Sequence, residues 1–293
     1  MNVIIVANRT NVKTMDALMQ IIVFLDMHGI AHTEIDVTDL PDSSFEGARE
    51  TVGRLYGNKS CDLIIVLGGD GTILHTARLA NVINAPMLGM NYGHLGFLAN
   101  TVDGSTIPLI ADVLSGEIVR EERVNLRVHV ECFGDELEEP TGPRDFFALN
   151  EIAIARGAMG HIVDFSFSVS GDHVASMRGD GVIVSTATGS TAYALSAGGP
   201  LVGPLHRGMI VAPLAPHTLY SRSIVTEHHD VVEVTFEEGS PSSYEVSLFA
   251  DGDALEFERP ISSITVTTGE RETTLLTHRD ESFYKQIART FFK

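Results

Sequence analysis

The sequence has few cysteines and no long apolar run, and each of these scarcities excludes a class of protein. Its 293 residues include only two cysteines, Cys61 and Cys132, which fit neither metal-ligand spacing nor a disulfide-rich framework. No apolar run approaches the roughly 20 residues that span a bilayer, and the N-terminus carries no basic segment or cleavage site typical of a secretory signal. We therefore expect a cytoplasmic protein with no membrane partner.

Positive charge is the third scarcity. Lys and Arg number 20 against 39 Asp and Glu, which gives a formal net charge of −19. This balance argues against a nucleic-acid groove or an anionic membrane surface as partner, because both need a basic face. It does not exclude an anionic small ligand, since salt screens exposed charges beyond roughly 8 Å and local amides, arginines or a divalent cation then dominate.

The first third of the chain alternates short apolar segments with amphipathic segments of helical length. Strands that are separated by helices in this way indicate βαβ units and a parallel sheet. We predict strands at residues 3–7, 32–37, 63–67 and 86–90, and helices at residues 14–28, 45–56 and 73–81.

Beyond Gly116, apolar and polar residues alternate, as is typical of half-buried antiparallel strands. The alternating segments are residues 123–133, 164–169, 231–236, 244–249 and 262–268. We also expect residues 134–144 to form an exposed hairpin loop or a partly disordered segment.

The predicted fold class is an α/β N-terminal domain with a parallel sheet plus a predominantly β C-terminal domain. We place the α/β domain at residues 1–116 and the β-rich domain at residues 117–275. Residues 276–293 are expected to contain a C-terminal helix that packs back on the first domain.

The most informative segment is Gly68-Gly69-Asp70-Gly71-Thr72-Ile73, which follows the strand predicted at residues 63–67. Glycines let a backbone approach a ligand closely, and amides at a helix N-terminus attract phosphate. Asp70 would stand at the carboxyl end of the strand, where open α/β sheets bind their ligands. Taken by itself, the segment is also explained by a tight strand-to-helix turn.

A second glycine-rich segment, residues 178–200, contains Asp180-Gly181 and four hydroxyl residues within residues 186–191. Hydroxyls and free amides suit a sugar, a phosphate or a purine edge. Helix capping explains any one of these hydroxyls, because Ser and Thr cap helices routinely. Capping alone does not readily explain four of them beside glycines.

Between the two segments, Asn150-Glu151 forms a polar pair inside an apolar strand. A buried amide or carboxylate costs roughly 1–3 kcal/mol when it is unpaired, so both side chains need partners. Those partners are either protein groups in a structural network or the hydroxyls of a ligand, and the sequence leaves both open.

Together these residues resemble the NAD kinase family. The matching segments, in the family's order, are Gly68-Gly69-Asp70-Gly71-Thr72, residues 91–97, Asn150-Glu151, Asp180-Gly181, residues 188–200, residues 216–219 and Arg222-Ser223. Gly-Gly-Asp-Gly turns also occur in lipid kinases and phosphofructokinases, whereas the Thr-Gly-Ser-Thr-Ala-Tyr stretch at residues 188–193 is more specific. The turn at residues 250–253 matches only loosely and is left outside the predicted site.

The resemblance implies a kinase that phosphorylates the 2′-hydroxyl of the adenosine ribose of NAD to give NADP. It implies ATP or polyphosphate as donor, Mg²⁺ or another divalent cation as cofactor, and a homodimer or homotetramer. Asp70 would be the general base, and Gly68, Gly69 and Thr72 the phosphate-donor loop. The implied NAD-binding residues are Gly71, His75, Phe97, Asn150, Glu151, His161, Arg178, Asp180, Thr191, Ala192, Tyr193, Ala194, Leu195 and Ser196.

Three alternatives compete with this reading. A lipid or sugar kinase of the same superfamily would use the Gly-Gly-Asp-Gly turn on another acceptor. A lipid kinase should show a long apolar acceptor pocket or a membrane-binding stretch, and the sequence shows no obvious one. A non-catalytic NAD(H)-binding sensor has little need of the carboxylate of Asp70 beside phosphates. A hydride-transfer enzyme is disfavoured because no Gly-x-Gly-x-x-Gly follows the first predicted strand.

Overall fold

The structure is a computed structural model that describes residues 1–57, 60–92, 96–102, 105–140, 142–158, 160–239, 246–278 and 282–292. The chain divides into two compact units. The first contains Met1–Asp42, Gly47–Arg123 and Glu272–Lys293, and the second contains Ser43–Glu46 and Val124–Arg271. Each unit is described by itself below.

The first unit is built on a mostly parallel sheet with the strand order β2-β1-β3-β4-β19-β6, and β5 also pairs with β4. Its strands are β1 (Asn2–Ala7), β2 (Ala31–Asp36), β3 (Leu63–Leu67), β4 (Met87–Asn91), β5 (Asn100–Thr101), β6 (Val119–Arg123) and β19 (Thr273–Thr277). Its helical segments are α1 (Val12–Met27), η1 (Val37–Asp39), α2 (Phe45–Leu55), α3 (Asp70–Ile83), α4 (Ile107–Ser115) and α7 (Phe283–Phe291).

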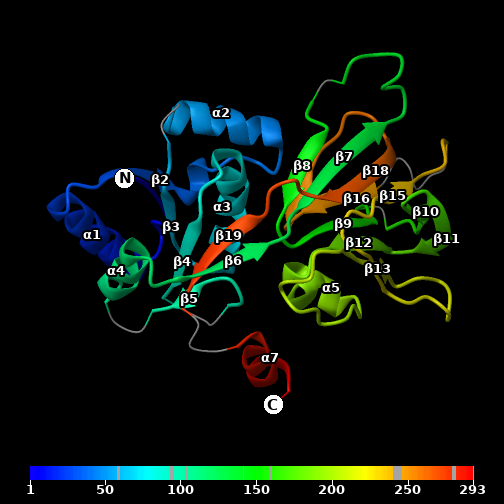
Figure 1. The fold of residues 1–293 in the computed structure, drawn as a ribbon. Coiled ribbons are helices and arrows are strands. Elements are labelled where there is room, and N and C mark those ends of the chain that lie inside the picture. Colours follow the sequence, from blue (N-terminus) through cyan, green and yellow to red (C-terminus); the bar gives the residue numbers. More distant parts are fainter. Residues whose placement is uncertain are drawn as a thin grey trace. The chain divides into compact units, whose positions relative to one another are not determined.

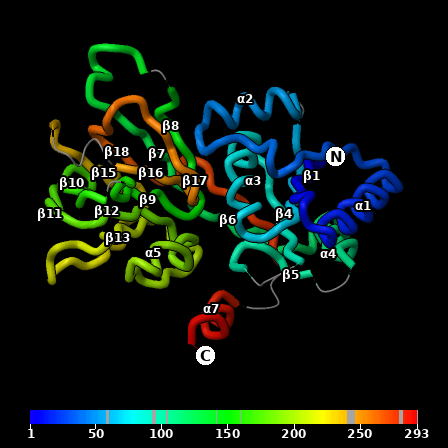
Figure 2. Tube along the Cα trace, turned by 180° about the vertical axis from the view of Figure 1, so that it is seen from behind, coloured from blue at the N-terminus to red at the C-terminus, as the bar shows by residue number. Residues whose placement is uncertain are grey.

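Helices cover both faces of this sheet, which explains why β3 is buried at every position. Figures 1 and 2 show α1 and α4 on one face, with α3 and α2 on the other. On the first face, Leu18 and Ile21 of α1 and Ile110 of α4 pack with Ile5 and Ile65 of the central strands. The sheet is therefore an apolar platform, and its polar residues stand where the strands end.

Two strands of this sheet come from distant parts of the chain. β19 lies between β4, to which it is parallel, and β6, to which it is antiparallel. The sequence suggested domain boundaries after residues 116 and 275. Apart from the short segment Ser43–Glu46, the chain passes between the units at Arg123/Val124 and Arg271/Glu272. The polar sequence of β6 gives no local sign of the sheet it joins, because that pairing is made across more than half of the chain.

The second unit consists of two antiparallel sheets with the orders β11-β10-β15-β18-β7-β8 and β14-β13-β12-β9-β16-β17. The strands of the first sheet are β7 (Leu126–Cys132), β8 (Asp145–Ala148), β10 (Val163–Val169), β11 (Asp172–Gly179), β15 (Val232–Thr235) and β18 (Ile261–Thr268). The strands of the second are β9 (Glu151–Arg156), β12 (Gly181–Ser185), β13 (Ile210–Leu214), β14 (Ile224–Val225), β16 (Val246–Ala250) and β17 (Asp253–Leu255), and the helical segments are η2 (Thr188–Thr191) and α5 (Tyr193–Ser196).

The core of this unit is formed by the inner faces of both sheets. β7 alternates buried and exposed residues, as an antiparallel strand with one solvated face should. Its Leu126, Val128 and Val130 join Ile152 of β9 and Val182 of β12 in one apolar cluster. The connection from β7 to β8 is mostly exposed, and Asp135 there forms ion pairs with Arg144 at 2.9 Å and Arg259 at 2.7 Å.

The predicted fold class is confirmed: an α/β unit with a parallel sheet and a predominantly antiparallel β unit. Among the described residues, none of the helices has both the length and the apolar character that crossing a membrane requires.

Candidate functional site

The Gly-Gly-Asp-Gly turn lies at the carboxyl edge of the parallel sheet in the first unit. Ala7 and Leu67, the last residues of β1 and β3, are in register with Met90, the second-last residue of β4. The Gly68 N–H donates to the Met90 carbonyl at 3.0 Å, which ties the turn to the neighbouring strand. Asp70 is the first residue of α3 and is half-buried. The structure thus places Asp70 at the edge where parallel sheets bind ligands.

Backbone amides hold the Asp70 carboxylate. Phe97 N–H donates to Oδ2 at 2.7 Å and Leu98 N–H donates to Oδ1 at 3.2 Å. These charge-assisted bonds fix the orientation of the carboxylate and stabilise its negative charge. The turn at Gly96 approaches so closely that a Cβ there would overlap the Asp70 side chain. Each carboxylate oxygen keeps a further lone pair for another partner.

The predicted phosphate-donor residues surround the N-terminus of α3. Gly69 is the N-cap and supplies no side-chain bond. The Thr72 N–H donates to the Gly69 carbonyl at 3.0 Å, whereas the N–H groups of Asp70 and Gly71 precede the first intrahelical bond. Gly71 is exposed. Thr72 is buried instead, and its side chain lies so close to Gly68 that a Cβ at Gly68 would overlap it. Gly68 is thus required for packing, while Gly69 and Gly71 leave the helix N-terminus open.

His75 lies one turn further along α3 and is half-buried. Its Nδ1 lies 3.2 Å from Nη2 of the fully buried Arg78. Arg78 also donates from Nη1 to the Pro41 carbonyl at 2.9 Å. Because a guanidinium can only donate, Nδ1 of His75 is the acceptor, so neutral His75 carries its proton on Nε2. Arg78 therefore fixes both the orientation and the tautomer of His75.

Phe97 packs against the C-terminal helix. Its ring is stacked on Phe291 of α7 at 5.8 Å and 8°, and it meets Phe283 edge-on at 6.4 Å. The side chain of Gln286, also in α7, donates to the Gly96 carbonyl. The helix thus contacts the same short segment whose amides hold Asp70. Residues 93–95 of the predicted motif lie outside the described residues.

In the second unit, Asn150 and Glu151 form the turn that leads into β9. Asp251, directly after β16, accepts from all three successive amides of this turn: Leu149 at 2.7 Å, Asn150 at 2.7 Å and Glu151 at 3.1 Å. The Asp251 N–H donates in return to the Glu151 carbonyl at 3.0 Å. One carboxylate therefore defines the backbone of the predicted pair.

Sequence reasoning left Asp251 out of the site. Its Asp-Gly pair, with φ of 50° and 90°, signals only the tight hairpin between β16 and β17. The amides that it accepts come from residues about a hundred positions earlier in the chain. No local pattern reveals such a contact.

Glu151 is a buried carboxyl group with an unusual environment. The residue is 8% exposed, and its Oε2 has no hydrogen-bond partner among the described residues. Burial raises its pKa to about 8, the nearby Asp251 carboxylate adds to this rise, and the N–H of Tyr193 opposes it. A polar atom that is buried without a partner costs stability and therefore needs an explanation.

The hydroxyls of the second glycine-rich segment hold the loop together. Ser185 Oγ donates to the Asn150 carbonyl at 3.0 Å, and Thr186 Oγ1 donates to the Leu149 carbonyl at 2.7 Å. Ser190 Oγ bonds both backbone groups of Val202. Thr186 Oγ1 also accepts the Gly189 N–H at 3.1 Å. These hydroxyls therefore fasten the Asn150 turn and the loop to one another.

The other predicted residues of this segment follow in η2 and α5. Thr191 bonds the Thr188 carbonyl at 3.2 Å, Ala194 is fully buried, and Tyr193 is 45% exposed. Ala192 and Leu195 are half-buried, and Ser196 is exposed.

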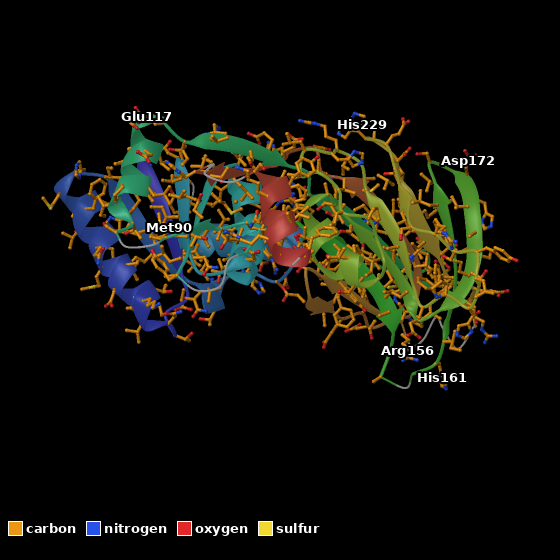
Figure 3. The ribbon with its side chains drawn as sticks, turned by 90° about the horizontal axis from the view of Figure 1, so that it is seen from below. Met90, Glu117, Arg156, His161, Asp172 and His229 are labelled. Atoms are coloured by element: carbon orange, nitrogen blue, oxygen red, sulfur yellow. The ribbon has the colours of Figure 1, made fainter. Side chains whose placement is uncertain are left out.

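Three predicted residues lie on outer strands or loops of the second unit. Arg178 is exposed on β11 and pairs with Asp164 at 3.2 Å. Asp180, between β11 and β12, pairs with Arg156 at 3.2 Å. His161 is exposed after β9, at the same edge of the unit as Arg156, as Figure 3 shows. The structure thus brings the predicted residues together in two groups, one in each unit, with Arg178, Asp180 and His161 at the margin of the second.

Comparison with solved structures identifies the fold. The chain superposes on yeast NADH kinase complexed with NADH with a TM-score of 0.79 and 22% identity, covering 100% of this chain and 87% of that one. It superposes on an NAD kinase from Archaeoglobus fulgidus in complex with ATP with a TM-score of 0.69 and 24% identity, covering 95% and 94%. The fold is that of kinases that act on nicotinamide dinucleotides.

Sequence comparison then gives the family. Residues 3–118 match the ATP-NAD kinase N-terminal domain, and residues 149–278 match the ATP-NAD kinase C-terminal domain. NAD kinases from Hahella chejuensis (37% identical over 78% of this chain and 74% of the relative) and Chromohalobacter salexigens (36% over 84% and 79%) align with it. One from Caldanaerobacter subterraneus is 42% identical over 60% of each chain. The chain belongs to the NAD kinase family of enzymes.

Proposed function

We propose that the protein transfers the γ-phosphoryl group of ATP to the 2′-hydroxyl of the adenosine ribose of NAD, with Asp70 as the general base. In this reaction a bond forms between the 2′-oxygen and the γ-phosphorus, and the bond to the β,γ-bridging oxygen breaks. The hydroxyl proton passes to Asp70. The observation that carries the proposal is the Asp70 carboxylate, oriented by two amides at the ligand-binding edge of the sheet.

Phosphoryl transfer asks an enzyme mainly for positioning and for neutralisation of charge. The open N-terminus of α3, with exposed Gly71, offers free N–H groups to the donor phosphates. His75, held by Arg78, presents its Nε2–H as a further donor. Together they would place negative phosphate oxygens beside Asp70, so a cation is needed to offset the repulsion.

The donor set around Asp70 fits a divalent cation that comes with the nucleotide. Among the described residues, no group of three or more His, Cys, Asp or Glu side chains could hold a metal by itself. Mg²⁺ in such enzymes takes one or two carboxylates and otherwise phosphate and water oxygens. Asp70 would supply the carboxylate oxygen, and the cation would neutralise phosphate charge.

The second group of residues would bind the dinucleotide. The Asn150 turn, fastened by Asp251 and Ser185, offers the side chains of Asn150 and Glu151 to ribose hydroxyls. Tyr193, whose backbone N–H bonds Glu151, is a partly exposed residue. We further propose a cytoplasmic homodimer or homotetramer, which light scattering on the purified protein tests.

The decisive experiment incubates the pure protein with NAD⁺, Mg²⁺ and either ATP or polyphosphate. NADP⁺ is followed with a dehydrogenase that accepts only NADP⁺, and NADH replaces NAD⁺ in a parallel series. NADP⁺ formation with ATP is expected. Binding of NAD⁺ without NADP⁺ formation from either donor would indicate a dinucleotide sensor, and phosphorylation of a lipid or sugar instead would indicate another kinase of the superfamily.

A further inference from the structure

Asp251 is bonded more heavily to its surroundings than a hairpin residue requires. A two-residue turn between β16 and β17 needs only a left-handed backbone, which Asp251 and Gly252 provide with φ of 50° and 90°. The carboxylate nonetheless accepts hydrogen bonds from three consecutive backbone N–H groups, those of residues 149–151, in another part of the chain. Such an arrangement fixes the peptide planes of residues 149–151 and therefore the directions of the side chains that leave them.

Building on the proposed function, we propose that Asp251 is the positioning residue for Asn150 and Glu151: its carboxylate holds their turn in the one geometry that presents both side chains to the dinucleotide. The Asn150 carbonyl is held from the other side by Thr186 N–H at 2.8 Å and Ser185 Oγ at 3.0 Å. With its N–H and carbonyl both bound, the backbone of Asn150 has no freedom left, and only its side chain remains for a ligand.

The carboxylate has a second effect, on the protonation of Glu151. The elements packed against Glu151 bring Asp251 from the β16–β17 turn, the backbone N–H of Tyr193 from α5, and uncharged Ser185 from β12. Burial, together with the Asp251 carboxylate as the charged group among these described neighbours, raises the pKa of Glu151 to about 8. At neutral pH Glu151 is mostly protonated, so its unpartnered Oε2 can carry the proton and donate it to a ligand hydroxyl or phosphate oxygen.

The test compares Asp251→Asn with a matched control, Asp253→Asn, two residues along the same hairpin. Asparagine tolerates a left-handed backbone, so the hairpin should form. Its amide oxygen still accepts from Asn150 and Glu151, but its NH₂ group faces the Leu149 N–H, and that bond is lost. NAD⁺ affinity is measured by calorimetry from pH 6 to pH 9.5, together with KM and kcat.

We expect Asp251→Asn to weaken NAD⁺ binding and raise KM by about 10- to 100-fold at pH 7, with a much smaller change in kcat. Wild-type affinity should fall as the pH rises through about 8, the pKa of Glu151. In Asp251→Asn this midpoint should move to lower pH, while Asp253→Asn keeps the wild-type profile. A merely structural role would lower the melting temperature without moving the midpoint.

Unchanged affinity and an unchanged midpoint in a folded Asp251→Asn protein would overturn the inference. Should that variant not fold, Glu151→Gln provides the test, because it must flatten the pH dependence of NAD⁺ binding. A midpoint near 8 that persists in Glu151→Gln would equally refute it.

Failure of the proposed function can be distinguished from failure of the inference about Asp251. Protein that binds NAD⁺ but makes no NADP⁺ fails as a kinase while the binding comparison still decides the role of Asp251. If NAD⁺ does not bind at all, carboxyl NMR of wild type and Asp251→Asn decides it: the Glu151 titration must move to lower pH in the variant, and an unmoved titration overturns the inference.

Discussion

Asp70 in the first unit and Glu151 in the second are two acidic residues with opposite surroundings. Asp70 is half-buried, accepts two backbone amides and faces the phosphate-attracting end of a helix. Glu151 is almost fully buried, has one oxygen with no hydrogen-bond partner among the described residues, and lies near a second carboxylate. The first environment orients the carboxylate through two backbone amides, whereas the second penalises a negative charge.

This difference assigns different chemistry to the two groups. A charged, oriented carboxylate with a free lone pair can accept a proton, which is the role proposed for Asp70. A carboxyl group that stays protonated at neutral pH can donate a hydrogen bond, which suits binding of hydroxyl or phosphate oxygens by Glu151. Four predictions test this contrast.

Replacing Asp70 with Asn should lower kcat by about 10²–10⁴-fold, the usual cost of losing a general base. NAD⁺ affinity, measured by calorimetry, should change much less. The substitution also places an NH₂ group against the Phe97 or Leu98 N–H, so some loss of melting temperature is expected.

Asp62→Asn is the matched control for this variant, because Asp62 also accepts a backbone N–H, that of Asn2, but at the opposite end of β3. It should retain wild-type kcat. Activity of Asp70→Asn within a few-fold of wild type would remove Asp70 from the role of base.

Replacing Asn150 with Ala should weaken NAD⁺ binding by about 1–3 kcal/mol, the scale of a lost buried polar contact. The melting temperature should stay close to that of wild type, because the bonds that Asn150 makes to Asp251, Thr186 and Ser185 all use its backbone. Calorimetry and a melting curve on the same preparation separate the two effects. A large drop in melting temperature with intact affinity would make Asn150 a structural residue only.

These two sites differ in how much of them the sequence could predict. The turn at Gly68–Asp70 was visible because strand, glycines and helix start are consecutive, so local rules describe its geometry. The Asn150-Glu151 pair was recognised as polar residues that need partners, but the chief partner, Asp251, lies about a hundred residues away. The same limit applies to β19, which enters the first sheet from the far end of the chain. Pairing between segments that are distant in the chain produces no local periodicity in the sequence from which it could be predicted.

Asp70→Asn should also bind NADP⁺ about tenfold more tightly than wild type, while its affinity for NAD⁺ barely moves. A 2′-phosphate beside Asp70 sets like charges together, and one such pair at about 4 Å costs on the order of 4 kcal/mol at an effective dielectric of 20. Counterions and nearby hydrogen-bond donors offset part of this cost, so the expected change in NADP⁺ affinity is only about tenfold. The measurement is a pair of titrations on each protein at fixed ionic strength. Equal or weaker NADP⁺ binding by the variant would mean that Asp70 does not face the 2′ position.

The smallest effect concerns stability and the second carboxyl group. The pKa of Glu151 is raised from 4.5 to about 8 in the folded protein, so between these values the unfolded chain ionises while the folded chain does not. The folded state then binds more protons, and its stability falls as the pH rises from about 4.5 to about 8, after which the penalty stays constant.

Glu151→Gln keeps the shape of the side chain and removes this penalty. Its melting temperature should match that of wild type near pH 5 and exceed it by on the order of 5 °C at pH 8.5. Glu233→Gln, at an exposed position on β15, is the control. Its difference in melting temperature from wild type should not increase with pH. If the difference between Glu151→Gln and wild type is the same at both pH values, Glu151 is ionised like an ordinary carboxylate. The contrast with Asp70 would then rest on geometry alone.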